Sequence, residues 1–427
     1  MRSVRIAVNS PRPLDEDVFG SVAGFQRAQR ELKQKLEARG IYFGDGVLPT
    51  YVYAFMSSVG QSRRWATHAE RFVEAMEGMA KELVEDDEFC ATLGMDREAL
   101  DLVRTDPGYA RTCVLCRPDG IPVGADIRFV ELNSDSPAMM MFLDIVAQCV
   151  LELDAFASLR VGVEHPRAAD RLLDALLGCY MEYAGSGAGD PTVAIVDWEA
   201  QKTRFEHQRL AEHFEARGYS TIVCDPRAFQ LVRGQLRVGD RRVHLVYRRA
   251  LSAELLARRD EVRPLLQAYR DGKICMVNPL RSYVAGVKSV LARPEVWGGA
   301  DLVPRTLLLD NHEARALVQK SRMNWALKRS QGHGGDGVVL PDSDNEAEWL
   351  HALGASCEEP WIAQEYLSLP RISLPELHDG QLVACEKFFN WNPFVFGGSF
   401  AGGIVRVSDS PLINITLGGG MLPVFTE

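Results

Sequence analysis

A lysine followed by a run of glycines is the first feature of the sequence that could carry chemistry. Lys328 ends an apolar stretch, and Gly332, Gly334, Gly335 and Gly337 follow it. Backbone N–H groups can approach phosphate oxygens closely where side chains are absent, and a lysine adds a point charge, so this stretch could bind a phosphate chain. It is not a P-loop, because the lysine precedes the glycines and no Gly-Lys-Ser/Thr follows. The alternative is a flexible surface hairpin that happens to contain a lysine.

Two oxygen-bearing side chains form the second candidate. Glu131 and Asn133 lie in the segment FVELNSDSP at 129–137, and in a strand they would project from the same face. A carboxylate and an amide carbonyl are hard oxygen donors, which suit a Mg²⁺ ion that also binds substrate phosphates. The alternative is a polar strand end whose Asn and Asp side chains make turn hydrogen bonds.

The cysteines favour a reducing compartment. There are nine, an odd number, and they are scattered along the chain rather than crowded as in a disulfide scaffold. Cys113 and Cys116 have the CxxC spacing of metal and redox sites, but no second pair accompanies them. Two cysteines of a strand are therefore preferred over a zinc or redox site.

The predicted secondary structure that positions these residues differs between the parts of the chain. Up to about residue 110, apolar residues recur at helical spacing, as in 25–36 and 65–83. Short strands are predicted at 111–115 and 127–132, on either side of a turn at 118–120 (Pro-Asp-Gly). The Ser-Pro pair at 136–137 is typical of a helix start.

A small α/β layer is predicted between about 185 and 277. Apolar runs at 192–197, 221–224 and 243–247 read as strands, with a helix between the first two. No GxGxxG motif occurs within this layer, so it lacks a dinucleotide fingerprint. From about 278 onward, glycine clusters alternate with strand-like runs, which is typical of an α+β domain with glycine loops.

Composition narrows the function classes. The chain has 427 residues, 46% of them apolar and 25% charged, with a formal charge of -10, which disfavours a broad phosphate-backbone footprint and hence nucleic-acid binding. The longest apolar stretch, 138–143, is far shorter than the roughly 20 residues that span a bilayer, and the first residues lack the apolar run of a signal peptide. We therefore expect a cytoplasmic protein that acts on small molecules and binds neither nucleic acid nor membrane.

In their order along the chain, the glycine-loop lysine and the ELNSDSP segment resemble the ATP-grasp superfamily in its circularly permuted form. The closest likeness is to the synthetase domain of glutathionylspermidine synthetase and its uncharacterised relatives. In the usual ATP-grasp order the E-x-N metal segment follows the lysine loop, whereas here it precedes the loop by roughly 200 residues. The likeness covers most of residues 105–427 and includes the segments at 193–226, 245–249, 277–280 with 288, 303–306, 392–394 and 402–406.

The resemblance implies a mixed α/β and α+β protein with a circularly permuted ATP-grasp fold, a Rossmann-like pre-ATP-grasp unit and a helical N-terminal part. The implied division is a helical part at 1–110, a permuted metal-binding segment at 111–184, the pre-ATP-grasp α/β unit at 185–277 and the nucleotide-binding domain at 278–427.

It also implies site roles, with ATP and Mg²⁺ as cofactors. Lys288 and Lys328 would hold the ATP phosphates, under a lid loop made by Gly332, Gly334, Gly335 and Gly337. The adenine slot would be lined, mainly by backbone groups, by Gln364, Glu365 and Tyr366. Glu131 and Asn133 would ligate Mg²⁺, Arg406 would contact the transferred phosphoryl group, and Arg111 would face the acyl phosphate.

One position departs from the family pattern. The family has Arg-x-Asp before the metal segment, with the Asp as a further metal ligand, whereas Arg111-Thr-Cys113 places a thiol there. Asp119 or Asp126 could take the place of that carboxylate. Cys113 would then mark a relaxed metal position rather than a nucleophile.

The function implied by the resemblance is that of an ATP-dependent carboxylate-amine ligase, which forms an amide through an acyl phosphate and releases ADP and phosphate. Two alternatives stay open: an ATP-dependent small-molecule kinase and a catalytically inactive ATP-binding module.

Overall fold

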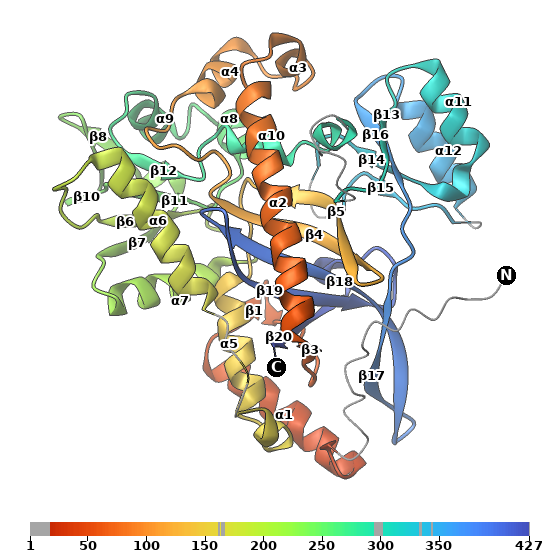
Figure 1. Ribbon diagram of the computed structural model, residues 1–427. Coiled ribbons are helices and arrows are strands. Elements are labelled where there is room, and N and C mark those ends of the chain that lie inside the picture. Colours follow the sequence, from red (N-terminus) through yellow and green to blue (C-terminus); the bar gives the residue numbers. More distant parts are fainter. Residues whose placement is uncertain are drawn as a thin grey trace.

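The computed structural model describes residues 18–160, 163, 167–293, 302–332, 335–342 and 345–426. Three sheets dominate these ranges: a seven-stranded central sheet, a four-stranded parallel sheet and a smaller four-stranded antiparallel sheet (Figure 1). None of the helices in these ranges combines the length and the apolar character needed to cross a bilayer.

The central sheet joins the two ends of the chain. Its strand order is β3-β20-β19-β18-β4-β5, with β17 paired to the far half of β18. All neighbours are antiparallel except β20 and β3, which are parallel. The strands are β3 (Phe55–Ser57), β4 (Leu115–Val123), β5 (Asp126–Asn133), β17 (Arg371–His378), β18 (Gln381–Phe396), β19 (Ser399–Ser408) and β20 (Gly420–Thr426).

Strand β4 corrects the prediction of a turn at 118–120. It runs straight through Pro118, Asp119 and Gly120, and the chain turns only at 124–125. Partners on both sides, β5 and β18, override the local turn chemistry, and a register shift between Asp119 and Gly120 absorbs the irregularity. A Cβ at Gly120 would lie 2.5 Å from Ile127 Cδ1, so glycine is needed here because of close packing rather than a turn.

One face of the central sheet is covered by the long helix α2 (Val59–Leu83), which crosses it diagonally (Figure 1). Its apolar stripe is buried: Phe72 stacks on Phe129 of the sheet, and the Trp65 ring packs at a tilt against Trp391. The short helices α3 (Asp87–Ala91) and α4 (Arg97–Arg104) follow. The part of the chain before residue 110 is thus mainly helical, but it also supplies β3 and the hairpin of β1 (Tyr42–Phe43) and β2 (Gly46–Val47).

A second core lies among α1 (Val22–Ala38), α5 (Met140–Leu151) and α6 (Ala168–Ala184). Helix α5 begins at Met140, not at the Ser-Pro pair where the sequence predicted it. The Glu206 carboxylate accepts hydrogen bonds from the N–H groups of Met139 and Met141, at 3.0 and 3.1 Å. The cap therefore comes from a distant glutamate, and the Ser136 hydroxyl donates instead to the Arg249 carbonyl.

The predicted α/β layer is confirmed as a parallel sheet of order β12-β11-β6-β7. Short strands alternate with helices, and three of the strands are fully buried while the one at 221–224 is partly exposed at the sheet edge. The elements are β6 (Val193–Val196), α7 (Arg204–Ala216), β7 (Thr221–Cys224), β11 (Leu245–Arg248), α8 (Ser252–Ala257), α9 (Arg263–Arg270) and β12 (Cys275–Val277), with a small meander of β8 (Gln230–Val232), β9 (Gln235–Val238) and β10 (Arg241–Arg242).

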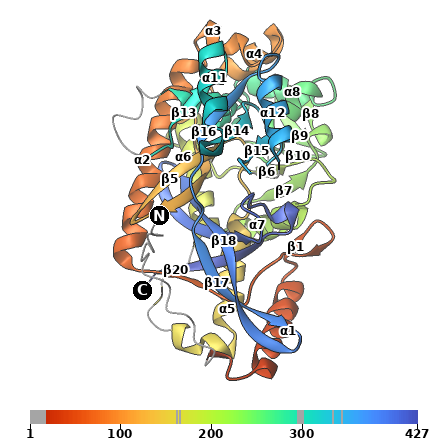
Figure 2. The ribbon, with the colours of Figure 1, turned by 90° about the vertical axis from the view of Figure 1, so that its right-hand side faces the viewer.

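The small antiparallel sheet has the order β13-β16-β14-β15 and a core of its own that contains Trp325, Trp349 and Trp361. In Figure 2 it stands above β18 and β17, next to the β4–β5 hairpin. Helix α10 (Ser282–Gly286) leads into it. Its elements are β13 (Thr306–Leu308), α11 (His312–Lys320), β14 (Trp325–Arg329), β15 (Val338–Val339), α12 (Glu346–Ala355) and β16 (Trp361–Glu365).

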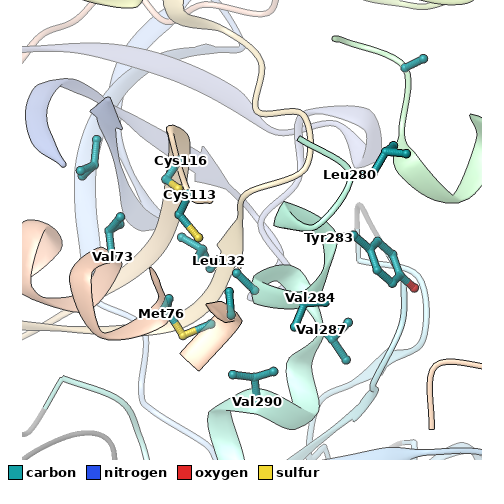
Figure 3. Packing of buried hydrophobic residues seen from close by; sticks show 14 of the residues in the cluster. Val73, Met76, Cys113, Cys116, Leu132, Leu280, Tyr283, Val284, Val287 and Val290 are labelled. Atoms are coloured by element: carbon teal, nitrogen blue, oxygen red, sulfur yellow. The ribbon is translucent and has the colours of Figure 1, made fainter. Parts of the chain in front are cut away.

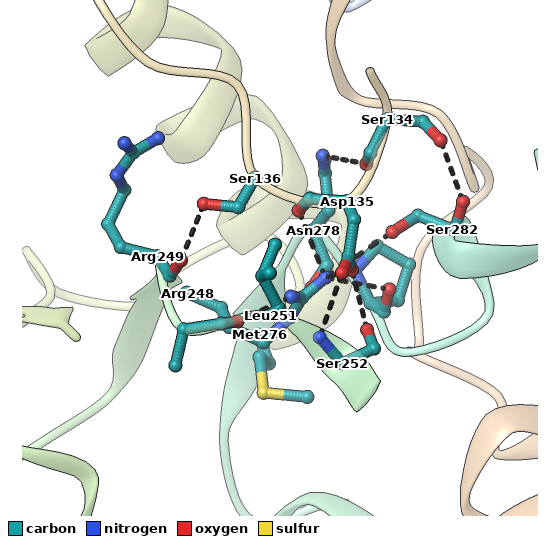
Figure 4. Close-up of polar contacts among 12 residues, drawn as sticks. Ser134, Asp135, Ser136, Arg248, Arg249, Leu251, Ser252, Met276, Asn278 and Ser282 are labelled. Atoms are coloured by element: carbon teal, nitrogen blue, oxygen red, sulfur yellow. Dashed lines mark hydrogen bonds and ion pairs between the residues drawn. The ribbon is translucent and has the colours of Figure 1, made fainter. Parts of the chain in front are cut away.

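A buried polar network fixes the chain just after β5 (Figure 4). Asp135 accepts from the N–H and the hydroxyl of Ser252, at 2.8 and 2.6 Å, and forms an ion pair of 2.7 Å with the fully buried Arg248. The side-chain amide of Asn278 donates to the Ser134 carbonyl at 2.6 Å. Because buried polar groups are costly unless paired, this network holds the end of β5 firmly against the parallel sheet.

Candidate active site

A cavity lies between the central sheet and the small antiparallel sheet. Strands β4, β5, β18 and β19 form one wall, and β14 and β16 form the other, with residues 411–414 at one side. Of the residues singled out in the sequence, the cavity wall includes Glu131, Asn133, Lys328, Gly335, Gln364, Glu365, Tyr366 and Arg406.

Three oxygen-bearing side chains converge on the central-sheet wall. Asp119 on β4 stands opposite Glu131 on β5, and the Asn133 amide nitrogen donates to Asp119 Oδ1 at 3.1 Å. Asn133 also donates to the Arg117 carbonyl at 3.1 Å, which directs its NH₂ group toward β4. Two carboxylates and an amide oxygen on adjacent strands are a donor set that fits Mg²⁺.

Two guanidinium groups lie beside these acids. Arg406 Nη2 contacts Asp119 Oδ2 at 2.6 Å, and its Nε donates to Asn390. Arg117 donates to the Ala138 carbonyl at 3.0 Å, while its buried Nε has no hydrogen-bond partner. Burial lowers the pKa of Arg117 to about 10, so the group stays charged at neutral pH. A charged, incompletely paired guanidinium in a cavity wall is suited to an anionic ligand.

Two lysines lie close to these acids: Lys328 in the opposite wall of the cavity, and Lys288 outside the cavity lining but next to Glu131. Lys328 Nζ donates to Gln364 Oε1 at 2.8 Å and to the Val130 carbonyl at 3.1 Å, which bridges the two sheets. Burial, helped by the nearby charge of Lys288, lowers the pKa of Lys328 to about 8, although Glu131 opposes the shift. Lys288 Nζ lies 3.3 Å from Glu131 Oε1 and donates to the Gly332 carbonyl at 2.8 Å.

The glycine loop is described at three of its four predicted positions, since Gly334 lies outside the described residues. Gly335 lines the cavity, and Gly332 lines a neighbouring pocket with Asn133 and Tyr283. At Gly337 the backbone has φ of +67°, and a Cβ would lie 2.7 Å from Arg329 Cβ. Only glycine fits this turn, which returns the chain to β15.

The stretch after β16 forms the remaining wall. The N–H groups of Glu365 and Tyr366 already donate to the carbonyls of Arg305 and Asn324, at 2.7 and 2.8 Å. A ligand at this wall would therefore contact residues after Tyr366 rather than the N–H groups of Glu365 and Tyr366. Leu367 and Leu369 follow β16 there, and further apolar side chains of the cavity lining come from other segments, which suits a flat heterocycle; these are Ile121, Leu340, Leu412 and Ile413.

Two residues assigned from the Arg-x-Asp pattern lie elsewhere. Arg111 forms an ion pair with Glu74 at 3.1 Å and is not among the residues that line the cavity. Cys113 is completely buried beside Cys116 beneath α2 (Figure 3). The Cys113 N–H donates to the buried carboxylate of Glu77 at 2.5 Å. The nearby Cys116 thiol and burial raise the pKa of Cys113, so it is an inert thiol in a core, not a metal position.

The sequence also contains Arg-x-Asp as Arg117-Pro-Asp119, and both of these charged residues line the cavity. The signal that identifies it is the antiparallel hairpin, in which Asp119 pairs with Glu131. Asp126, the other carboxylate considered, lies near the hairpin turn, pairs with Arg64 at 3.2 Å and is half exposed. Of the two carboxylates named in the sequence analysis, only Asp119 lies in the cavity.

Comparison with known proteins identifies the fold. No protein-family model matches the sequence, and no curated protein matches it. Among solved structures, the glutathione synthetase-like effector GSS30 from Globodera pallida, in its apo form, covers 96% of this chain and 99% of its own, at 9% identity and a TM-score of 0.65. A γ-glutamylcysteine synthetase-like protein from Methylobacillus flagellatus KT covers 86% of each chain at 10% identity and a TM-score of 0.40. The ATP-grasp ligase PsnB, complexed with a minimal precursor, covers 55% of this chain and 90% of its own at 16% identity and a TM-score of 0.32.

The likeness to GSS30 extends over nearly the whole of both chains and shows the fold. The ATP-grasp fold that the sequence predicted is confirmed, whereas the likeness to glutathionylspermidine synthetase and the circularly permuted order stay predictions.

Proposed function

We propose that this protein is an ATP-dependent carboxylate-amine ligase. The observation that carries the proposal is the cavity between two sheets, whose wall brings Lys328 together with Asp119 and Glu131, while Lys288 lies outside that lining and contacts Glu131 at 3.3 Å. Cations from one side and oxygen donors from the other are what a nucleotide triphosphate and its counterion need. The proposal includes the circularly permuted order, in which the acidic strands β4 and β5 precede the lysine strand β14 in the chain.

The nucleotide would lie along the small sheet. Its base would occupy the apolar wall beyond Tyr366, and its phosphates would extend toward the glycine loop and the two lysines. Since Lys328 is buried and held by Gln364, it needs no reorganisation to meet the phosphate charge.

Asp119, Glu131 and Asn133 would hold Mg²⁺. When bound, the ion would neutralise phosphate charge as the phosphoryl group is transferred. The residues themselves are already oriented, because Asn133 donates to Asp119 and Arg406 holds the second oxygen of the same carboxylate. The salt bridge of Lys288 with Glu131 keeps that acid at the cavity in the free protein.

The reaction needs positioning and charge neutralisation rather than a protein nucleophile. A substrate carboxylate oxygen would attack the γ-phosphorus of ATP, and the bond to the β–γ bridging oxygen would break to release ADP. Arg117 and Arg406 would contact the phosphoryl oxygens during this transfer. An amine nitrogen would then attack the acyl carbon, lose a proton and expel phosphate, which leaves the amide.

The test is to incubate the protein with ATP, Mg²⁺ and a panel of carboxylic acids in the presence of hydroxylamine. An acyl phosphate reacts with hydroxylamine to give a hydroxamate, so ADP and hydroxamate should form in equal amounts with the right acid. Glu131→Gln should abolish both products. The matched control is Asp126→Asn, because Asp126 is an exposed carboxylate of the same hairpin outside the cavity.

Other outcomes would replace the proposal. A stable phosphorylated product that forms without any amine would indicate a kinase. ATP binding by calorimetry, without ADP release in any acid and amine mixture, would indicate an inactive binding module.

A further inference from the structure

A cluster of three potential metal ligands lies on the β17–β18 hairpin, which extends away from the body of the molecule (Figure 1). Glu376 and His378 stand two residues apart on β17, and Cys385 comes from the paired strand β18. Their ligand atoms all lie within 4.8 Å of one another. This cluster is separate from the ATP-grasp cavity, whose lining includes none of the three residues.

The distances match those of a tetrahedral site. His378 Nε2 lies 3.4 Å from Cys385 Sγ and 3.4 Å from Glu376 Oε2. Around a tetrahedral zinc ion, bonds of about 2.0 Å to nitrogen or oxygen and about 2.3 Å to sulfur separate the ligand atoms by roughly 3.3–3.5 Å. A small shift of the Cys385 or Glu376 side chain would therefore complete the triangle.

A neighbouring lysine already orients the carboxylate. Lys387 Nζ binds Glu376 Oε1 at 2.7 Å, which leaves Oε2 toward the histidine. Lys387 is buried, and its charge is balanced by Asp409 at 2.8 Å. Ligating carboxylates are commonly held in this way by a second hydrogen-bonding group. Because Asp409 balances the charge of Lys387, the negative charges of Glu376 and of a Cys385 thiolate would together neutralise a divalent cation.

The three residues leave a fourth coordination position open. Glu376 and His378 line a cleft of about 910 Å³ that also includes Tyr51 and Tyr53. Thiolate, imidazole and carboxylate together suit zinc and its neighbours in the transition series, not Mg²⁺. We propose that Glu376, His378 and Cys385 bind a zinc-class divalent ion with three protein ligands and one position that faces this cleft.

Co²⁺ serves as the probe, because a thiolate ligand gives cobalt a near-ultraviolet charge-transfer band. Titration of the full-length protein with Co²⁺ under reducing conditions should produce this band at one equivalent, and Zn²⁺ should displace it, since zinc binds such sites more tightly. Cys385→Ser should abolish the band. His378→Gln should weaken binding by at least tenfold, because even a second-shell partner is commonly worth about 10–100-fold in affinity.

Two control variants keep the assignment specific. Cys357→Ser removes an exposed cysteine of another region and should leave the band unchanged. Glu131→Gln in the ATP-grasp cavity should also leave it unchanged, so this test stands or fails separately from the ligase proposal. Any of three results would overturn the proposal: no band in the wild-type protein, a band that persists in Cys385→Ser, or cobalt that Zn²⁺ does not displace. The three side chains would then be a hydrogen-bonded cluster only.

Discussion

Burial of the charged Lys328 side chain should lower the free energy of unfolding of the nucleotide-free protein at neutral pH. The pKa of Lys328 is about 8 in the folded protein, against 10.5 for an ordinary lysine, chiefly because burial disfavours the ammonium form. Between these two pH values the unfolded chain binds one proton more than the folded one. The free energy of unfolding must therefore rise with pH across this window. Below pH 8 the full cost is present, and above pH 10.5 it is gone.

The size of the effect follows from the shift. A difference of this size amounts to about 3 kcal/mol over the whole window, of which about 2.5 kcal/mol falls between pH 7.5 and pH 10. Lys328→Met removes the titrating group but keeps the length of the side chain. It also leaves Val130 and Gln364 without their donor, which adds a cost that does not depend on pH.

The measurement is urea denaturation of both proteins at several pH values from 7.5 to 10, with EDTA present and without nucleotide. The stability of the wild type relative to Lys328→Met should rise by about 2.5 kcal/mol over this range. Lys320→Met, which changes an exposed lysine on α11, should show no such trend relative to the wild type. A difference between wild type and Lys328→Met that stays flat over this range would refute the reasoning.

Two further predictions concern the acidic wall and the misassigned cysteine. Asp119→Asn keeps the shape of the side chain but removes one anionic donor, so the Mg²⁺ concentration for half-maximal ATP turnover should rise about tenfold or more; an unchanged requirement would exclude Asp119 from the metal site. Cys113→Asp should bury a second carboxylate beside Glu77 and lower the stability in urea by about 3 kcal/mol or more, without any change in the Mg²⁺ requirement. Tighter Mg²⁺ binding in that variant would return Cys113 to the site.

Local signals in the sequence predicted the parallel layer well. Its strands are short apolar runs, and β6, β11 and β12 are buried on both faces, so pattern and environment agree there; the edge strand β7 is only partly buried. Apolar residues also predict strands for the lysine stretch and the ELN segment, and both are strands, β14 and β5. What they face across the cavity depends on pairing between distant parts of the chain, which no local pattern contains.

The error at 118–120 shows this limit. Pro-Asp-Gly has the chemistry of a turn, yet β18 and β5 enclose the segment and force it into a strand. With a turn assumed there, the sequence leaves Asp119 and Asp126 as equal candidates and aligns the Arg-x-Asp pattern with Arg111, which lies outside the cavity. The approach of β5 to Lys328, which lies roughly 200 residues further along the chain, and the contact of Arg406 with Asp119 could be anticipated only from the resemblance to a known fold.

The strand order of the central sheet also determines when its strands can pair during translation. Asp119 and Arg406 are 287 residues apart in the sequence, and β4 has no partner on its β18 side until the C-terminal part has been made. At roughly 5–20 residues per second, the ribosome needs about 15–60 s to add that stretch. Throughout this interval the β4–β5 hairpin has an unpaired strand edge on the side that β18 later occupies, whereas α2, which precedes it in the chain, is already made. The nascent chain is thus exposed to mispairing at this edge for far longer than a hairpin takes to form.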